Sequence, residues 1–337
     1  MRIPEGALWV RMPRFIGDAL MIHHAAAPLK AAGQPLVAWG PASVIDLFEG
    51  SGTYAATEPE TDRPGLAAMA GLLRRNRAAG VLNLPRSTRA LLAGFLARTP
   101  LRAGWAEAGG ALLATHSLPF KGRTDHQVDR YQALIARAFP GLPPAEPEAF
   151  LPREEARSEA EKLRRELGLE APFVILGLGS AAWVKRLGTP LWTELIHWLR
   201  SQGLAHVLLG GGFFEDLEQA EALRRAFPGI PDLCGKVSLP VSAALVSQAA
   251  VVVGNDSGLA HLAAACQVPL VAAFGPTKPE WTAPKGDRIT ILRHDSLACL
   301  GCLLLQCPVP GHPCMERLDP NRLRAAVAAA LAGAARP

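Results

Sequence analysis

The sequence contains few aromatic residues and no long apolar run. Aromatic side chains make up 6% of the chain, with only two tyrosines. No stretch of about 18 consecutive apolar residues occurs, so we expect no transmembrane helix. The first residues, MRIPEGALWVRMPRF, lack the apolar core and the small-residue cleavage site of a signal peptide. Together these absences favour a cytoplasmic protein.

Two motif classes are also missing. No G-x-G-x-x-G turn is followed by an acidic residue about 20 positions later, which argues against a nicotinamide-dependent oxidoreductase. No concentrated basic run is interleaved with aromatic residues, which argues against nucleic-acid binding. The net charge of +5 lies mostly in the first 150 residues. An excess of this size is typical of solvated surface, with an anionic partner such as lipid phosphate as the alternative.

What the sequence does contain is an alternation of short apolar runs and helical patterns. Its 337 residues, 49% apolar and 19% charged, are enough for about two globular domains. Residues 140–152 hold five prolines and predict a stiff linker. We therefore expect two α/β domains, 1–150 and 151–337, each a doubly wound parallel sheet. The expected strands are 7–12, 35–40 and 81–85 in the first domain, and 173–180, 206–212, 251–256, 270–275 and 289–294 in the second. The expected helices are 18–32, 42–49, 66–80, 87–99, 126–139, 190–202, 214–227, 239–249, 258–266 and 320–334.

The segment 251–284, VVVGNDSGLAHLAAACQVPLVAAFGPTKPEWTAP, carries the strongest site signal. A buried strand ends at Asp256, and Ser257 and Gly258 begin a helix whose free N–H groups suit an anion. His261 lies one turn further along, and the turn FGPTKPEWTAP follows the next strand. The two neighbouring turns predict a diphosphate site. The alternative is that Asp256 is only a helix cap and His261 a core residue.

A second signal lies at the N-terminus, where a strand is followed by Pro13-Arg14-Phe15-Ile16-Gly17-Asp18 and a helix. Gly17 allows a tight turn, and the helix start stabilises the charged form of Asp18. An ionised aspartate facing a cleft between domains can accept a proton from an attacking hydroxyl. A capping aspartate is the alternative.

Two further segments carry candidate residues. In GLGSAAWVKR (177–186), Ser180 and Lys185 follow a strand and are candidates for contact with a diphosphate. Near the C-terminus, four cysteines within 16 residues suit a structural metal site such as zinc, although their spacing is not that of a zinc ribbon. Free or redox-labile thiols are the alternative. The four cysteines are Cys299, Cys302, Cys307 and Cys314.

These residues, in this order, resemble the heptosyltransferases of glycosyltransferase family 9. NDSGLAHLAAA followed by FGPTKPEWTAP is the most specific part, and the cysteine segment LACLGCLLLQCPVPGHPCM is similar to the family's C-terminal tail. The N-terminal PRFIGD turn most resembles the heptosyltransferase II branch. The resemblance covers nearly the whole chain. It implies a GT-B fold, with two Rossmann-like domains facing across a cleft, the acceptor on 1–150 and the nucleotide sugar on 151–337. The last helix would pack back on the first domain.

The resemblance also implies roles for individual residues. Asp18 matches the family's proposed catalytic base, and Lys185 matches a lysine near the donor phosphates. Lys236 lies where the family contacts the nucleotide, and Glu215 aligns with an acid that holds the ribose. Arg14 and Gly17 would lie in the loop near the acceptor. The donor loop itself would comprise Asp256, Ser257, Gly258 and His261.

As a family member, the chain would transfer a heptose or a related sugar from an ADP-sugar to a lipopolysaccharide-core or other glycolipid acceptor. The resemblance implies inversion at the anomeric carbon, no metal cofactor, and a monomer at the inner membrane surface. Arg14 replaces a small hydroxyl residue and Leu187 replaces a tryptophan that are usual in the family. A different nucleotide sugar or acceptor therefore stays open, as does a non-enzymatic module built on the cysteine cluster.

Overall fold

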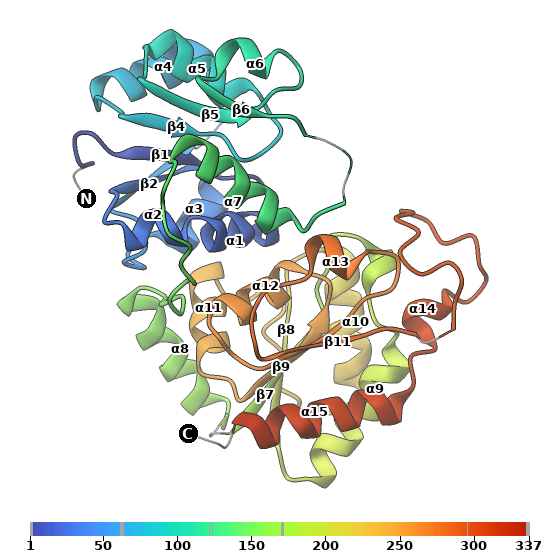
Figure 1. Ribbon diagram of the computed structural model, residues 1–337. Helices are drawn as coiled ribbons and strands as arrows, with labels where there is room; N and C mark the ends of the chain where they lie inside the picture. The colour runs from blue at the N-terminus through green and yellow to red at the C-terminus, as the bar shows by residue number, and fades with distance from the viewer. Residues whose placement is uncertain are drawn as a thin grey trace. The chain divides into compact units, whose positions relative to one another are not determined.

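The computed structural model describes residues 3–60, 64–120, 122, 124–169, 172–294 and 296–334. The chain divides into two compact units, Met1–Arg153 and Glu154–Pro337, each with its own parallel sheet (Figure 1). The division falls at the end of the proline-rich segment, where residues 142–153 form no helix or strand. Across the described ranges, no helix is both long and apolar enough to cross a membrane.

The first unit contains a six-stranded sheet in the order β3-β2-β1-β4-β5-β6. All its pairings are parallel. Because β1 lies in the middle and the chain winds outward from it in both directions, the sheet is doubly wound. The strands are β1 (Leu8–Arg11), β2 (Leu36–Pro41), β3 (Ala56–Glu60), β4 (Gly80–Leu82), β5 (Leu101–Trp105) and β6 (His116–Leu118).

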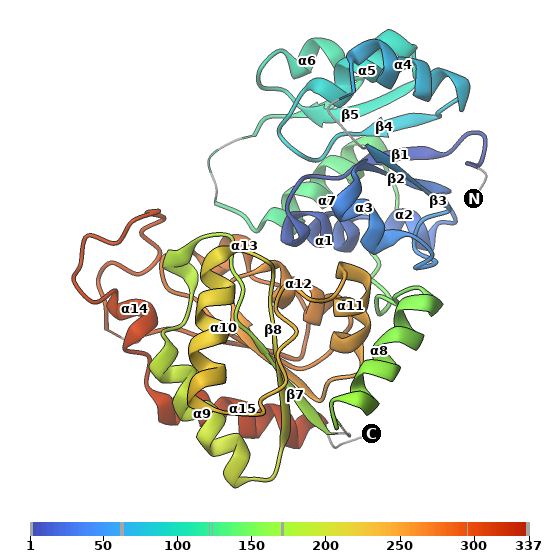
Figure 2. The same cartoon turned by 180° about the vertical axis from the view of Figure 1, so that it is seen from behind.

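Helices cover both faces of this sheet. In Figures 1 and 2, α4, α5 and α6 lie on one face, and α1, α2, α3 and α7 lie on the other. Trp9 and Trp39 from neighbouring strands pack edge to face with ring centroids 5.8 Å apart, in a core that α4 and α5 complete. The helices are α1 (Ile16–Ala25), α2 (Ala27–Ala31), α3 (Ala42–Phe48), α4 (Leu66–Arg75), α5 (Arg89–Ala97), α6 (Gly110–Leu113) and α7 (Gln127–Ala138).

The second unit contains a five-stranded parallel sheet in the order β11-β10-β9-β7-β8. The strands β7, β9 and β10 are buried on both faces, as their continuous apolar runs predict. Its strands are β7 (Phe173–Gly177), β8 (Ala205–Leu209), β9 (Val251–Asn255), β10 (Leu270–Ala273) and β11 (Ile289–Leu292).

Helices also cover both faces of the second sheet. In both views α8, α11 and α12 lie on one face, and α9, α10 and α15 lie on the other. The last helix, α15, packs on α9 and on β9, β10 and β11 of its own unit, where Leu323 and Val327 join the core. The helices are α8 (Glu154–Glu166), α9 (Thr189–Ser201), α10 (Phe214–Ala226), α11 (Leu239–Ser247), α12 (Gly258–Ala265), α13 (Pro279–Thr282), α14 (Pro313–Glu316) and α15 (Pro320–Ala334), with a short 3-10 turn at Trp183–Lys185.

The structure corrects the element prediction at several points. The expected helix 18–32 is two helices, α1 and α2, which meet at Ala26 because Pro28 lies in the first turn of α2. The strands β3, β5 and β6 and the helix α8 were not predicted, since their sequences lack a continuous apolar run or a wide apolar stripe.

Candidate functional site

The winding of the second sheet defines where its ligand site is expected. After β7 the chain passes through α9, on one face of the sheet, to β8. After β9 it passes through α12, on the other face, to β10. The connections that leave β7 and β9 therefore run to opposite faces of the sheet, and ligands of doubly wound sheets bind at such a switch point of the strand order. The segments that follow these two strands are the ones that carry the predicted donor residues.

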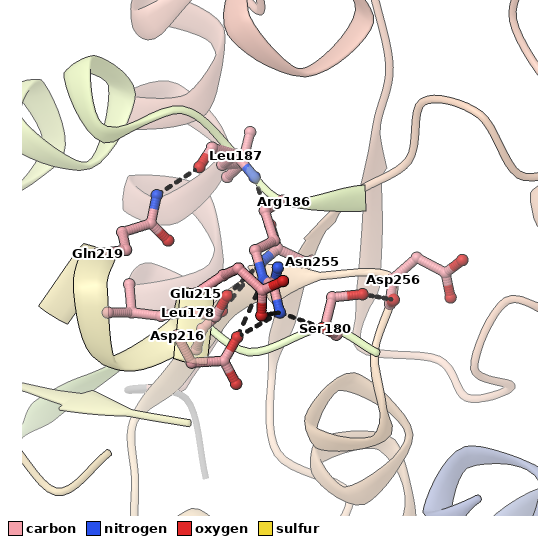
Figure 3. A network of polar contacts seen from close by, with 10 residues as sticks. Leu178, Ser180, Arg186, Leu187, Glu215, Asp216, Gln219, Asn255 and Asp256 are labelled. Atoms are coloured by element: carbon pink, nitrogen blue, oxygen red, sulfur yellow. Dashed lines mark hydrogen bonds and ion pairs between the residues drawn. The ribbon is translucent and has the colours of Figure 1, made fainter. Parts of the chain in front are cut away.

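Polar contacts join the two loops at this switch point. Lys185 Nζ lies 2.8 Å from a carboxylate oxygen of Asp256, and the hydroxyl of Ser180 donates to the backbone carbonyl of Asp256 at 3.3 Å. Figure 3 shows Ser180 beside Asp256, with the two residues coming from different loops. The side chain of Asp256 is almost buried, while that of Lys185 is 29% exposed. The structure thus places three of the predicted donor residues together, with one ammonium group within reach of solvent.

The N-terminus of α12 is uncapped. Ser257 is its N-cap residue, yet its side chain accepts no hydrogen bond from the helix. The buried Ser257 hydroxyl has no hydrogen-bond partner among the described residues. By contrast, the N-cap Ser238 of α11 accepts from the backbone N–H of Val241. A helix start with free N–H groups and an unused hydroxyl is suited to an anion. His261, one turn further on, is 7% exposed.

Sequence reasoning missed a hydroxyl on the neighbouring turn. Strand β10 pairs with β9, and the backbone N–H of Asp256 donates to Ala273 O at 3.1 Å, so the turn after β10 lies beside the turn after β9. The side-chain oxygen of Thr277 on that turn is buried and has no hydrogen-bond partner within the described ranges. Its position after a buried strand, in Gly275-Pro276-Thr277, was the signal that could have identified it.

A buried polar network behind these loops was also missed. Asn255 is fully buried; its side chain accepts from Leu187 N at 2.9 Å and donates to Leu178 O at 2.8 Å. Arg186 Nε donates to Asp216 Oδ1 at 3.0 Å, and Arg186 Nη2 forms an ion pair with the same oxygen at 2.8 Å (Figure 3). Burial raises the pKa of Asp216, and the charge of Arg186 opposes that shift. The network ties the loops after β7, β8 and β9 together.

Two predicted donor residues lie outside this cluster of contacts. Lys236 pairs with Asp232, whose carboxylate lies 2.5 Å from the ammonium. It lines a surface pocket of about 740 Å³ with residues of the segment 228–232, none of which was predicted at the donor site. Glu215 is about half exposed and lies 3.8 Å from Arg186 Nη2, at the start of α10. The ion pair with Asp232 thus competes with the predicted contact between Lys236 and the nucleotide, while Glu215 borders the polar network.

The first unit has an equivalent switch point, between β1 and β4. The loop after β1 carries Arg14, which is exposed. Gly17, expected in this turn, instead lies with Asp18 in the first turn of α1, and Asp18 is partly exposed. Arg86, in the loop after β4, is exposed and stacks on the ring of Phe120 at 4.6 Å. Arg14, Asp18 and Arg86 therefore flank the crevice that this fold offers to a ligand.

The four C-terminal cysteines lie next to the turn that carries Thr277. Gly301 N, between Cys299 and Cys302, donates to Gly275 O at 3.0 Å, and the sulfur of Cys314 packs against Gly275. All four are free thiols, and burial raises the pKa of Cys314 to about 11, with the other three thiols nearby adding to the shift. Within the described residues no group of three or more histidine, cysteine or acidic side chains is arranged to hold a metal ion.

Comparison with known proteins decides the family. The sequence model of glycosyltransferase family 9 (heptosyltransferase) matches residues 67–312, well over half of the chain. The chain belongs to this family. The predicted resemblance to heptosyltransferase II is also confirmed, since lipooligosaccharide heptosyltransferase 2 of Haemophilus influenzae is 29% identical over 223 residues, or 62% of this chain. The alignment covers 64% of that relative, so the chain spans just under two thirds of its length.

Solved structures of family members share the fold. Escherichia coli ADP-heptose lipopolysaccharide heptosyltransferase II matches with a TM-score of 0.78 and 22% identity, covering 97% of this chain and 99% of that one. E. coli heptosyltransferase WaaC with ADP matches with a TM-score of 0.71 and 18% identity, covering 96% and 99%. The expected GT-B fold, built from two doubly wound Rossmann-like units, is therefore confirmed.

Proposed function

We propose that this protein is an inverting heptosyltransferase that moves a heptose from an ADP-sugar to a glycolipid acceptor of the lipopolysaccharide core. One observation carries the proposal: the switch point between β7 and β9 combines a partly exposed ammonium, an uncapped helix start and an unused hydroxyl. These groups belong to Lys185, α12 and Ser257. Family membership and the likeness to an ADP-bound relative support the same reading.

The donor diphosphate would bind in the second unit. The first N–H groups of α12 and the Lys185 ammonium would stabilise the negative charge that develops on the leaving ADP, which is electrostatic catalysis by groups already in place. Such charge stabilisation requires no metal ion, so we expect turnover to persist in EDTA. A complete loss of turnover in EDTA, restored by a metal, would show that the four cysteines or another site hold a required ion.

The acceptor would bind in the first unit. Arg14 and Arg86 supply positive charge at the switch point between β1 and β4, which suits the anionic groups of a glycolipid at the inner membrane surface. Asp18 would take the proton from the acceptor hydroxyl as that oxygen attacks the anomeric carbon. A single displacement of this kind inverts the configuration of the sugar. The non-enzymatic cysteine module is not favoured, because the family match extends over both units.

The first experiment measures ligand-induced stabilisation by ADP, UDP, GDP and NAD, for wild type and for Lys185→Ala. A ligand that binds only the folded state must raise the melting temperature. We expect ADP to give the largest shift and Lys185→Ala to reduce it. A preference for UDP or GDP would keep the reaction type and discard the ADP-heptose donor. A preference for NAD, or no shift with any nucleotide, would overturn the donor site.

A second measurement tests the reaction itself. With ADP-heptose and a heptose-deficient core acceptor, NMR of the product reports the configuration at the new anomeric centre. Inversion relative to the donor is expected for a single displacement with Asp18 as the base. Retention would contradict this mechanism even if transfer occurs.

A further inference from the structure

Asp216 is a buried carboxylate to which the proposed reaction gives no role. It lies in the first turn of α10 and is 0% exposed. An ionised carboxylate in a protein interior is costly unless it is paired and hydrogen-bonded, and removal of one partner leaves the other charge unpaired. The contacts of Asp216 should therefore explain why a carboxylate is buried at this position.

The carboxylate joins the loops that follow two neighbouring strands. Arg186 Nε donates to its Oδ1 at 3.0 Å, and Arg186 Nη2 lies 2.8 Å from the same oxygen. The backbone N–H groups of Ser180 and Gly211 also stabilise the charged form of Asp216. Ser180 follows β7, whereas Gly211 follows β8. The approach is close: a Cβ at Gly179 would lie 2.9 Å from Asp216 Oδ2. Asp216 thus connects the loops that follow β7 and β8, and it can approach them closely because Gly179 has no side chain.

Arg186 closes the loop that carries Lys185. Its Nη2 donates to the backbone carbonyl of Ser180 at 2.6 Å, so one guanidinium connects the two ends of the loop 180–186. On the other side, Asn255 accepts from Leu187 N, the residue that follows Arg186. Ser180 and Lys185, which contact Asp256, are therefore held between two sets of buried hydrogen bonds.

We infer that Asp216 and Arg186 are positioning residues for the nucleotide-sugar site: their buried charge pair fixes the loop 180–186, so that Ser180 and Lys185 meet the donor diphosphate. This inference rests on the proposed function. A misplacement of about 1 Å in a group that binds the reacting part of a substrate can cost about a hundredfold in rate. The pair acts on the donor through the loop and does not touch the acceptor.

The test uses Asp216→Asn and Arg186→Lys in the full chain. Asn keeps the shape but loses the charge, and Lys keeps the charge but cannot make the paired bonds to Asp216 and Ser180 O together. We expect ADP to bind at least about tenfold more weakly by calorimetry, and kcat/KM for the donor to fall about 10- to 100-fold. The KM for the acceptor should stay unchanged.

Arg164→Gln is the matched control, because Arg164 also bonds a side chain in the second unit, Gln248 at 2.7 Å, but packs on Phe173 at the start of β7. Its loss should lower the melting temperature without changing the ADP dissociation constant of the folded protein. If either site variant is folded and binds ADP as wild type does, the pair is only structural and the inference is overturned. If Asp216→Asn does not fold, Arg186→Lys decides. Absence of ADP binding by wild type would instead overturn the proposed function.

Discussion

Asp18 is the residue whose side chain the proposed chemistry requires most directly. It lies in the first turn of α1 beside the switch point of the first unit. Asp18→Asn keeps the size and removes the base, so kcat should fall by about 10²- to 10⁴-fold, the usual contribution of general base catalysis. ADP binding, which belongs to the second unit, should not change. Initial rates and calorimetry on the same preparation measure both quantities.

The matched control for Asp18 is Asp129→Asn, since Asp129 is the first-turn aspartate of α7 in the same unit. If both substitutions lowered kcat equally, or if Asp18→Asn retained near-normal turnover, Asp18 would not be the base.

His23 makes the stability of the first unit depend on pH. Its ring lies among those of Phe48, Tyr54 and Phe150, with centroids 5.6 to 6.3 Å away. Burial lowers the pKa of His23 to about 4, and neighbouring positive groups add to this. The unfolded chain takes up the proton near pH 6.5, so stability is complete above that pH and is lost as the pH falls toward 4. The loss expected from this shift is about 3 kcal/mol.

Urea unfolding at pH 7.5 and pH 5 should show about 2 kcal/mol of this loss, because pH 5 still lies above the folded pKa of about 4. His23→Phe removes the titrating group from an aromatic cluster that can accept a ring, so the variant should lose less stability than wild type over that interval. Equal losses in the two proteins would assign the acid sensitivity to other groups.

The sequence alone could indicate a site residue only where neighbouring residues in the chain mark its position. Lys185, Asp256 and Ser257 lie in the segments that follow the buried strands β7 and β9, and that local pattern made them candidates. Asp216 and Arg186 are 30 residues apart, and the side chain of Asn255 contacts a residue 68 positions away. No local pattern indicates such partners, because only the folding of three strands side by side brings them together.

At the scale of elements, substitutions in the turns after β9 and β10 should weaken ADP binding without lowering the stability of the fold. Ser257→Ala and Thr277→Val remove buried hydroxyls that have no partner across the described ranges. Removing an unsatisfied polar group costs little or nothing in stability. If these hydroxyls bind the donor diphosphate, each variant should melt at or above the wild-type temperature and bind ADP about 3- to 10-fold more weakly, the value of one hydrogen bond.

Ser238→Ala supplies the contrast for these variants. The hydroxyl of Ser238 caps α11, so its removal should lower stability by about 1 kcal/mol and leave ADP binding unchanged. Full ADP affinity in both Ser257→Ala and Thr277→Val would separate these turns from the donor site.

The strands that the sequence predicted are those with continuous apolar runs. The expected strands 251–256 and 270–275 correspond to β9 and β10 within one or two residues. Strand β3 was missed because its sequence, ATEPE, contains a proline and two glutamates; it is an edge strand and buries only Ala56 fully. Helix α8 was missed because it buries only two alanines, too narrow a stripe to separate it from the linker before it.

At the scale of the whole molecule, each unit carries a complete core and one switch point. The proposed donor contacts, including Lys185 and Ser257, all belong to the second unit, and α15 completes the core of that unit through Leu323 and Val327. Asp18, in contrast, belongs to the first unit. The residues proposed to bind the nucleotide and the residue proposed as the catalytic base therefore lie in different units of the chain.

This separation predicts that residues 154–337 expressed alone fold, bind ADP nearly as tightly as the full chain, and transfer no sugar. Circular dichroism, calorimetry with ADP and a transfer assay measure the three properties. A folded fragment whose ADP affinity is lower by more than tenfold, about 1.4 kcal/mol, would mean that the first unit contributes directly to the donor site. In that case the switch point between β7 and β9 would be only part of the site, since its contacts are all present in the fragment.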